Sequence, residues 1–168
     1  ARGWNMVTKI KGTKGSHGTN GSHPGPGGNG EDKSFTQNGA IGLDSMSYEV
    51  TGGAGGVGGN GTTGNGAAGG NGGNANITLN GNIFNNPATT TLTVSMTAPG
   101  GDGGLGGTGA VGFNPGPQGN GGNATVNING NILQPNKTMG NITLEGIAIG
   151  GQGTRDGNAS ATLSGNVV

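Results

Sequence analysis

The sequence predicts an all-β or irregular fold with almost no α-helix, in which a bundle of polyglycine II helices merges into short antiparallel β-strands. Glycine supplies 45 of the 168 residues, about four times its usual share. It recurs at every third residue over long runs, and apolar residues alternate with polar ones between those runs. We therefore expect one elongated domain over 1–168, with an N-terminal segment at 1–45 and strand and glycine-helix repeats at 46–168.

The period of three residues matches the polyproline II helix, which has three residues per turn, and matches neither an α-helix nor a β-strand. The main runs lie at 12–21, 52–72 and 100–122. Where glycine is doubled, two of the three faces of the helix lack a Cβ atom, so neighbouring backbones can come close. Because such a helix has no internal hydrogen bonds, its N–H and C=O groups must pair with other helices. The chain has only 7 prolines, which favours a single-chain bundle over a collagen triple helix.

Alternation with period two predicts half-buried strands. The stretches 73–83, 122–132 and 157–167 echo one another, and each begins with Gly-Asn-Ala. Further alternating segments lie at 46–50, 92–96 and 142–144. We expect a meander in which a strand runs into a glycine helix, turns, and returns. The turns are predicted at 22–25, 62–65, 113–117 and 154–157 at the glycine end, and at 36–45, 84–90 and 133–140 at the other end.

Composition excludes several classes of protein. The formal net charge is zero and only 8% of residues are charged, without a basic patch, so we expect no nucleic-acid partner. No apolar run approaches the roughly 18 residues of a membrane span, so we expect no membrane insertion. Hydrophobic residues make up 27%, which limits the size of a conventional core. The chain has no cysteine, so disulfides and thiolate metal sites are excluded.

No catalytic set is recognisable, and we predict that the protein is not an enzyme and binds no cofactor. Only Glu31 and Asp32 adjoin among the acidic residues, and neighbours in an extended chain point to opposite sides. The glycine runs do not continue into Gly-Lys-Ser/Thr, as a phosphate-binding loop would. The stretch 27–34 fits the first six positions of the calcium-binding RTX nonapeptide, but Ser34 follows where an apolar residue belongs. We predict no metal site, with calcium near Asp32 left open.

The tracts 52–73, 100–122 and 150–153, separated by short variable turns, resemble the tip adhesins of T-even-like phage long tail fibres. That resemblance implies a sandwich of polyglycine II helices. It also implies an extracellular, non-enzymatic adhesin on a virion, whose variable turns bind a bacterial cell-surface protein or glycan. Phe113 and Arg155 are the preferred anchors, because aromatic and arginine side chains dominate interfaces. The residues expected at the receptor-binding tip are His23, Thr62, Thr63, Phe113, Asn114, Arg155 and Asp156.

Two alternatives remain open. The chain could be a self-assembling subunit of an extracellular filament or cell-surface matrix, since an open strand edge invites pairing with another copy. It could also bind ice, because its glycine tracts resemble those of springtail antifreeze proteins, although no flat Thr/Ala face is evident in the sequence. The residues expected to mediate assembly are Trp4, Val7, Ile10, Leu163, Val167 and Val168.

Overall fold

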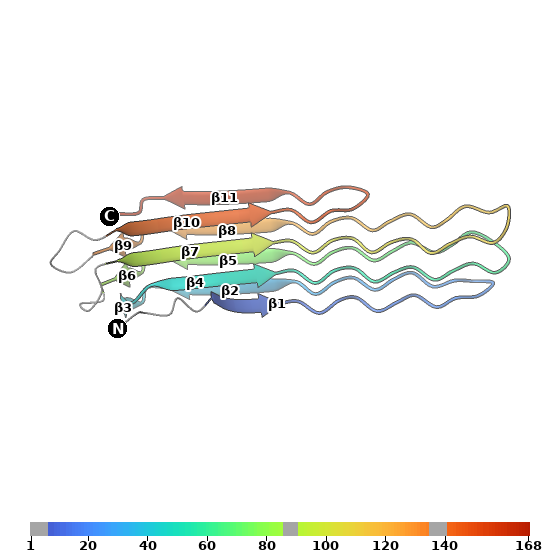
Figure 1. The fold of residues 1–168 in the computed structure, drawn as a ribbon, viewed down its shortest axis with the longest axis horizontal. Helices are drawn as coiled ribbons and strands as arrows, with labels where there is room; N and C mark the ends of the chain where they lie inside the picture. The colour runs from blue at the N-terminus through green and yellow to red at the C-terminus, as the bar shows by residue number, and fades with distance from the viewer. Residues whose placement is uncertain (1–6, 86–90, 135–140) are drawn as a thin grey trace.

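The computed structural model describes residues 7–85, 91–134 and 141–168, which form β-strands and irregular tracts without α-helix (Figure 1). No helix in this part of the chain could span a membrane. The first sheet has the order β1 (Val7–Lys11), β4 (Met46–Thr51), β7 (Leu92–Pro99), β10 (Ile142–Ile149). The second has the order β11 (Ala159–Ser164), β8 (Ala124–Asn129), β5 (Ala75–Asn80), β2 (Lys33–Asn38). A third, small sheet contains β3 (Ile41–Leu43), β6 (Ile83–Phe84) and β9 (Ile132–Leu133).

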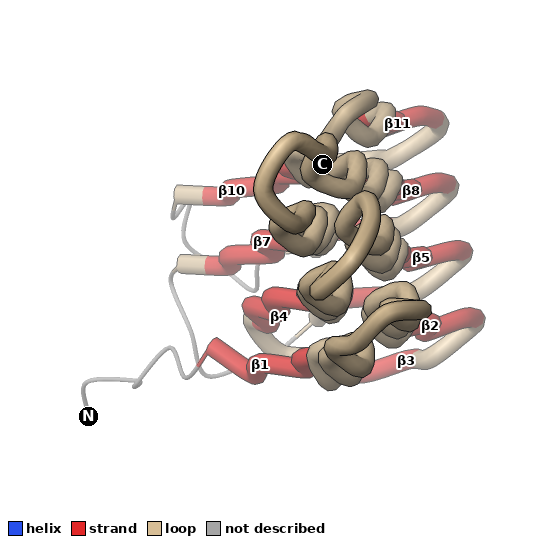
Figure 2. The backbone as a smooth tube through the Cα atoms, turned by 90° about the vertical axis from the view of Figure 1, so that its right-hand side faces the viewer, coloured by secondary structure: helices blue, strands red, loops and turns tan. Residues whose placement is uncertain are grey.

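All strand pairs among the described residues are parallel, so the predicted antiparallel pairing is wrong. The predicted meander does exist, but successive strands enter opposite layers. β4 runs toward the glycine end in the first sheet, and β5 returns in the second (Figures 1 and 2). Each sheet therefore collects strands of one direction, and its pairs join successive coils, with Ile77 opposite Val126 and Leu79 opposite Ile128. The chain is a parallel β-solenoid in which each coil contributes one strand to each main sheet.

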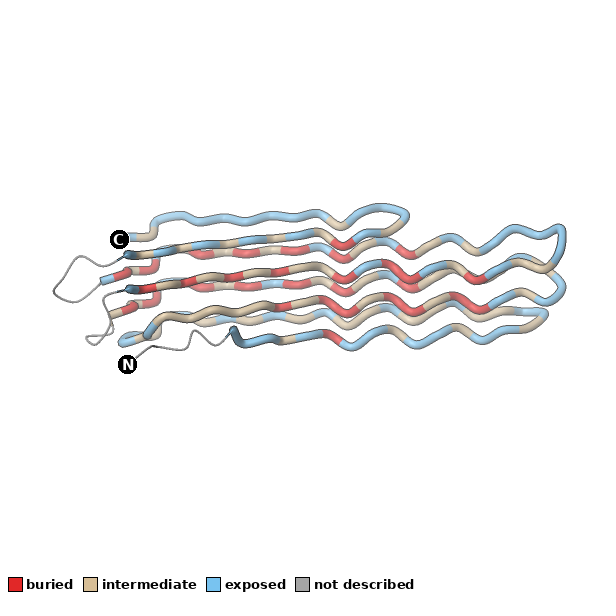
Figure 3. Tube along the Cα trace, in the orientation of Figure 1, coloured by how far each residue is buried: buried red, intermediate tan, exposed pale blue. Residues whose placement is uncertain are grey.

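The hydrophobic core lies between the two main sheets, in the middle coils. In β5, β7 and β8 alternate residues are buried, as the period-two pattern predicted. Figure 3 shows that burial is concentrated in these coils and fades toward the outermost strands. The core residues with the largest fully buried side chains are Phe84, Ile77, Leu79, Met96, Ile128, Leu133, Val50, Val94 and Val126.

The end of the molecule opposite the glycine tracts contains sharp corners followed by the third sheet. Gly39, Gly81 and Gly130 follow the second-sheet strands with φ angles of 62°, 64° and 62°, a left-handed conformation that glycine adopts readily. The chain then forms β3, β6 and β9. The segments 36–45, 84–90 and 133–140 are therefore not simple turns, because strand residues occupy part of each; 86–90 and 135–140 lie outside the described residues.

An asparagine ladder fixes these corners. Asn82 and Asn131 are fully buried, and their side chains join successive coils. The Oδ1 of Asn131 accepts from the backbone N–H and the Nδ2 of Asn82, at 3.0 and 2.9 Å. Asn131 in turn donates from its backbone N–H and its Nδ2 to the Oδ1 of Asn166, both at 3.0 Å. Buried amides cost several kcal/mol when unpaired, so the ladder specifies the register of the coils.

The glycine tracts continue the strands of each layer, and hydrogen bonds join them at every third residue. The N–H groups of Gly12, Gly15 and Gly18 donate to the carbonyls of Thr51, Ala54 and Val57, each at 2.8 Å. The next tract repeats the pattern, since Gly55 and Gly58 donate to Asp102 and Leu105 at 2.8 and 2.9 Å. The three-residue period of the sequence thus sets the spacing of lateral hydrogen bonds within a layer.

A second set of bonds crosses between the layers. Gly53, Gly56 and Gly59 donate to Glu31, Gly28 and Gly25 at 2.8, 2.8 and 2.9 Å, so these two tracts run in opposite directions. Viewed end-on, the tracts form tight coils arranged in two stacks (Figure 2). Two of every three N–H groups in a doubled-glycine tract are therefore bonded inside the bundle, and the third belongs to the outward residue.

These bonds require close approach of the backbones, which explains the doubled glycines. A Cβ atom built on Gly56 would lie 1.9 Å from the carbonyl oxygen of Ser16, and one on Gly70 would lie 1.9 Å from that of Gly28. Both neighbours are backbone atoms, which cannot move aside without breaking hydrogen bonds. Glycine is required at these positions because there is no space for a Cβ atom.

We expect Gly56→Ala to destabilise the fold by about 3 kcal/mol or more, because overpacking against fixed backbone is costly. Gly64→Ala is the matched control, since a Cβ there meets nothing within 4 Å, and its effect should stay within about 0.5 kcal/mol. Chemical denaturation with circular dichroism measures both. Equal stability of the two variants would show that the tracts are not packed as described.

We expect Asn131→Ala to lower the free energy of unfolding by about 2–4 kcal/mol, because it leaves the buried N–H of Asn82 and the half-buried Oδ1 of Asn166 without hydrogen bonds. Asn80→Ala, at an exposed position in the preceding coil, should change it by less than about 0.5 kcal/mol. Thermal unfolding compares the two. A negligible effect at Asn131 would mean that the ladder does not specify the register.

Candidate functional surfaces

Three of the four predicted glycine-end turns lie together. Thr62 donates its N–H to Gly21 at 3.0 Å and Ala110 donates to Gly64 at 2.9 Å, so the turns at 22–25, 62–65 and 113–117 adjoin. Phe113 is 53% exposed, so it is not packed away against the nearby prolines. The exposed predicted tip residues at this end are His23, Thr62, Thr63, Phe113 and Asn114.

The fourth turn lies elsewhere. Thr154 donates its N–H to Gly119 at 3.0 Å, and Gly121 donates to the carbonyl of Arg155 at 2.9 Å. Arg155 and Asp156 therefore lie beside 119–121, partway along the third coil, because the last glycine hairpin is much shorter than the others (Figure 1). The structure does not bring these two residues to the tip. Their role in receptor binding stays a prediction.

The predicted assembly residues lie at the two ends of the stack of coils. Val7 and Ile10 belong to β1 at one end, while Leu163 belongs to β11 at the other (Figure 2). Val167 forms an isolated bridge to Ile132, and Val168 is 72% exposed. Trp4 lies outside the described residues.

The end strands have open edges and incompletely covered core faces. All residues of β11 are exposed, including Leu163 at 44%. Leu144 of β10 is half-buried, as are Ile10 and Phe35 at the opposite end. Phe35 stacks on Tyr48 with ring centroids 4.1 Å apart. Both ends therefore present apolar side chains next to strand edges.

The outer surface of the second sheet is a flat array of uncharged polar residues, which sequence reasoning missed. Its inward positions are apolar in β5, β8 and β11 but include Lys33 and Gln37 in β2, whereas every outward position is Ser, Thr or Asn. The alternation in β5 and β8 was visible in the sequence, but the alignment of four such strands in one register was not. We call this surface the Asn/Ser/Thr face; its rows across the sheet are Ser34, Asn76, Thr125, Ser160; Thr36, Thr78, Asn127, Thr162; and Asn38, Asn80, Asn129, Ser164.

Two rows of Asx residues extend this surface onto the glycine tracts. The Asn29 row comprises Asn29, Asn71 and Asn120, and the Asp32 row comprises Asp32, Asn74, Asn123 and Asn158. In each row the Oδ1 of one residue accepts the outward N–H of the equivalent residue in the next coil, at 2.6–2.9 Å. These side chains satisfy the third N–H of the tract, which the bundle itself leaves unbonded.

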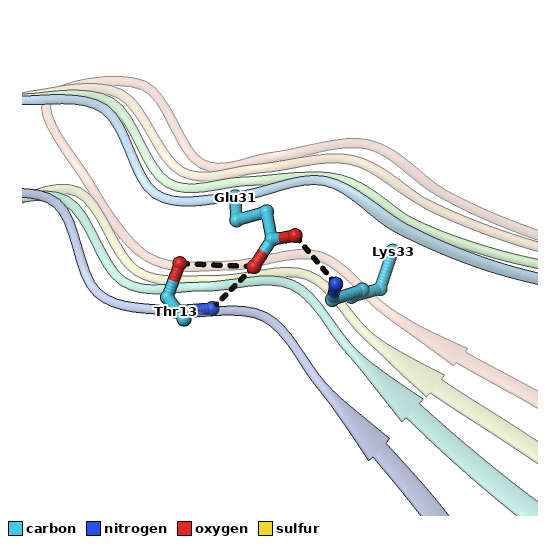
Figure 4. Close-up of polar contacts among 3 residues, drawn as sticks. All are labelled: Thr13, Glu31 and Lys33. Atoms are coloured by element: carbon cyan, nitrogen blue, oxygen red, sulfur yellow. Dashed lines mark hydrogen bonds and ion pairs between the residues drawn. The ribbon is translucent and has the colours of Figure 1, made fainter.

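Glu31 contacts Thr13 and Lys33 in the first coil (Figure 4). Its carboxylate accepts from Lys33 Nζ, and from the N–H and Oγ1 of Thr13, both at 2.9 Å. The hydrogen bond from Lys33 is the largest cause that lowers the pKa of Glu31 to about 2, followed by those from Thr13. The contacts link the two layers of the first coil and need no catalytic role.

The calcium-like stretch 27–34 is the end of a glycine tract and the first two residues of β2, and Asp32 in it accepts the N–H of Asn74 at 2.6 Å. No group of three or more His, Cys, Asp or Glu side chains suited to a metal ion occurs in 7–85, 91–134 and 141–168. His17 and His23 are both exposed, as expected for surface residues.

No protein-family model and no curated protein matches this chain. Among solved structures, it is similar to the nine polyproline type II helical bundle springtail antifreeze protein from Granisotoma rainieri. The identity is 24%, the alignment covers 100% of this chain and 99% of the other, and the TM-score is 0.26. At that score the similarity carries no argument about fold or function.

Proposed function

We propose that this protein is a non-enzymatic structural subunit that assembles by stacking its coils. The last coil of one copy would pair with the first coil of the next, in the direction in which the coils stack within one copy. The observation that carries this proposal is the identical register and length of the second-sheet strands. β2, β5, β8 and β11 each have six residues and pair position by position. A further copy can therefore place its β2 on β11 in the same way that β8 lies there.

The glycine tracts support the same geometry if they are polyglycine II helices, which we propose from their bonding. Bonds recur at every third residue and in two directions, toward the same layer and toward the facing layer. That pattern fits a threefold helix without internal hydrogen bonds. Such helices stack without limit, because each edge repeats the donors and acceptors of the one before.

The free edge of β11 has backbone groups available for this contact. Asn158 and Ser164 direct their carbonyls to β8, where Ala124 and Gly130 donate to them at 2.8 and 2.9 Å. Because successive residues of a strand point their N–H and C=O groups to opposite edges, those of Ala161 face the open side. Asn158 also offers the Oδ1 that would accept the N–H of Asp32 from the next copy, as Asn123 accepts that of Asn158.

The ends of the core favour association as well. Solenoid proteins that stay monomeric close their ends with capping repeats that have a polar outer face. Here Leu163 and Leu144 lie at one end, and Ile10 and Phe35 lie at the other. Stacking would bury these side chains at about 25 cal/mol per Å² of apolar surface removed from water. A head-to-tail contact of this kind does not close, so it generates filaments.

We expect electron microscopy of the purified protein to show regular filaments, and Leu163→Lys to abolish them, because the next copy would bury the charge. Thr162→Lys is the matched control, since it adds the same charge on the outer face of the same strand, and it should still form filaments. Ala161→Pro should block assembly independently, because it removes an N–H from the open edge while β8 keeps its partners. Discrete particles from the unaltered protein, or filaments from all three variants, would contradict the proposal.

Ice binding is the second candidate, and the Asn/Ser/Thr face is the observation that favours it. The face is flat and uncharged, and it repeats at the strand spacing of about 4.8 Å and at about 6.6 Å along each strand. A regular array of hydroxyl and amide groups can order water into a matching lattice. The structure thus contains a regular flat face that was not evident in the sequence. Asn and Ser occupy many of the positions that Ala would occupy in a Thr/Ala face.

If the protein binds ice, Thr162→Lys should be the harmful variant and Leu163→Lys the harmless one, the reverse of their expected effects on filament assembly. The unaltered protein should show thermal hysteresis in a nanolitre osmometer. Thr162→Lys should reduce it strongly, because the charged side chain projects from the array, and Leu163→Lys should leave it unchanged. No hysteresis from the unaltered protein would exclude this function.

The tip-adhesin hypothesis stays a prediction. Phe113 and Val111 are both exposed, and their turn adjoins the other turns of the glycine end, which suits a contact surface. The extracellular location, on a virion or a cell surface, also stays a prediction.

A further inference from the structure

The surface of the second layer contains a groove whose asparagine Nδ2 groups are used neither in the proposed assembly nor in the proposed ice binding. It is an open polar groove of about 420 Å³ between the Asn29 row and the Asp32 row. Three successive coils contribute to it, so it runs across the tracts, parallel to the stacking direction. The lining residues are Asn29, Gly30, Asp32, Asn71, Gly72, Asn74, Asn120 and Gly121.

The orientation of the amides in this groove is set by the backbone. The N–H of Asn71 donates to the Oδ1 of Asn29, and that of Asn120 donates to the Oδ1 of Asn71, both at 2.9 Å. An N–H can bond only to the oxygen of an amide, so these contacts fix which atom is Oδ1 and which is Nδ2. The Nδ2 groups of this row make no hydrogen bond to protein within the described residues. They form a line of hydrogen-bond donors about 4.8 Å apart, the spacing of adjacent chains in a parallel layer.

The floor of the groove has no side chains. A Cβ on Gly30, Gly72 or Gly121 would point into the bundle, within 1.8–1.9 Å of a backbone carbonyl oxygen. The glycines therefore turn backbone atoms toward the groove, and a ligand can lie close to them. Because the tracts are regular and no side chain projects from these glycines, the floor is flat.

The charge of the groove selects among polar ligands. Asp32 is the one ionisable residue that lines it, and the nearby Glu31 is paired with Lys33. A carboxylate disfavours polyanions, while it can accept hydrogen bonds from hydroxyl groups. The ligand that matches is neutral, carries many hydroxyl groups, and repeats at the spacing of the amides.

We propose that this groove binds a linear, uncharged polysaccharide that lies across the tracts, with about one sugar per coil. Ring and hydroxyl oxygens of successive sugars accept from the Nδ2 groups of Asn29, Asn71 and Asn120. A sugar hydroxyl donates to Asp32 on the opposite wall. The length that one pyranose adds to an extended chain is close to the separation of the coils, so one contact repeats along the ligand. In a stack of copies, the groove would continue from one copy to the next.

The test uses the whole chain with cellohexaose and mannohexaose as neutral probes and a hexamer of galacturonate as an anionic one. Side-chain amide signals in ¹H–¹⁵N spectra report binding at each asparagine. We expect the signals of the Asn29 row to shift with one of the neutral hexamers, and Asn120→Ala to weaken binding about tenfold or more, equivalent to about 1.4 kcal/mol. Gln152→Ala is the matched control, because its N–H is likewise capped by a side chain of the preceding coil, the Oδ1 of Asp102, but it lies in the other layer, outside the groove; it should bind as the unaltered protein does.

A second pair of variants covers the case in which truncation disturbs the tract. Asn71→Asp keeps the Oδ1 that caps Asn120 and removes the donor, so it should weaken binding, whereas Asn60→Asp, which keeps the equivalent cap on Thr108 in the other layer, should not. Thermal unfolding verifies that each pair is equally stable. Three results would overturn the proposal: no shift with either neutral hexamer up to about 10 mM, tighter binding of galacturonate, or equal effects of groove and control variants.

Discussion

Backbone hydrogen bonding between glycine tracts, repeated every three residues, is the interaction on which the structure depends. The glycine N–H groups of the tracts donate to carbonyls of neighbouring tracts, and buried backbone groups need such partners. The tracts approach closely because glycine donates at the contacts, as at Gly56, whose N–H donates to the carbonyl of Gly28 at 2.8 Å. Each bond contributes a net stabilisation of only about 0.5–1.5 kcal/mol, but the array is dense, and it offsets the conformational entropy that glycine loses on folding.

The sequence predicted almost no α-helix, the alternation of strands with glycine tracts and the positions of most strands. It predicted the wrong strand direction, because neighbours along the chain were taken as neighbours in the sheet. The similarity between 73–83 and 122–132 already indicated the pairing, because aligning the two stretches places Ile77 opposite Val126, as in the sheet. Parallel neighbours follow naturally from a repeat that stacks on itself. The third sheet could not be predicted, because β6 and β9 have two residues each and depend on the corners at Gly81 and Gly130.

The functional surfaces follow from the same repeat. One polar residue per strand or tract is unremarkable in a sequence, but coils in register convert it into a row, as for Thr36, Thr78 and Thr162. Likewise, an asparagine that caps one backbone N–H becomes a line of amide donors when three coils repeat it. The turn that contains Arg155 departs from the repeat. Its position in the sequence predicted that it lies at the tip, but its hairpin is shorter than the others and ends before the tip. Repetition therefore explains the flat face, the groove and the open ends.

Amide hydrogen exchange measured by NMR tests the central claim most directly. The N–H groups of Gly53, Gly56 and Gly70 bond inside the bundle and should exchange slowly, near the rate set by global unfolding. The outward N–H groups of Ala54 and Val57, which have no partner among the described residues, should exchange quickly. This alternation along one tract is the result that the account predicts. Rapid exchange at all of these positions would contradict it, because it would mean that the glycine tracts are loose loops.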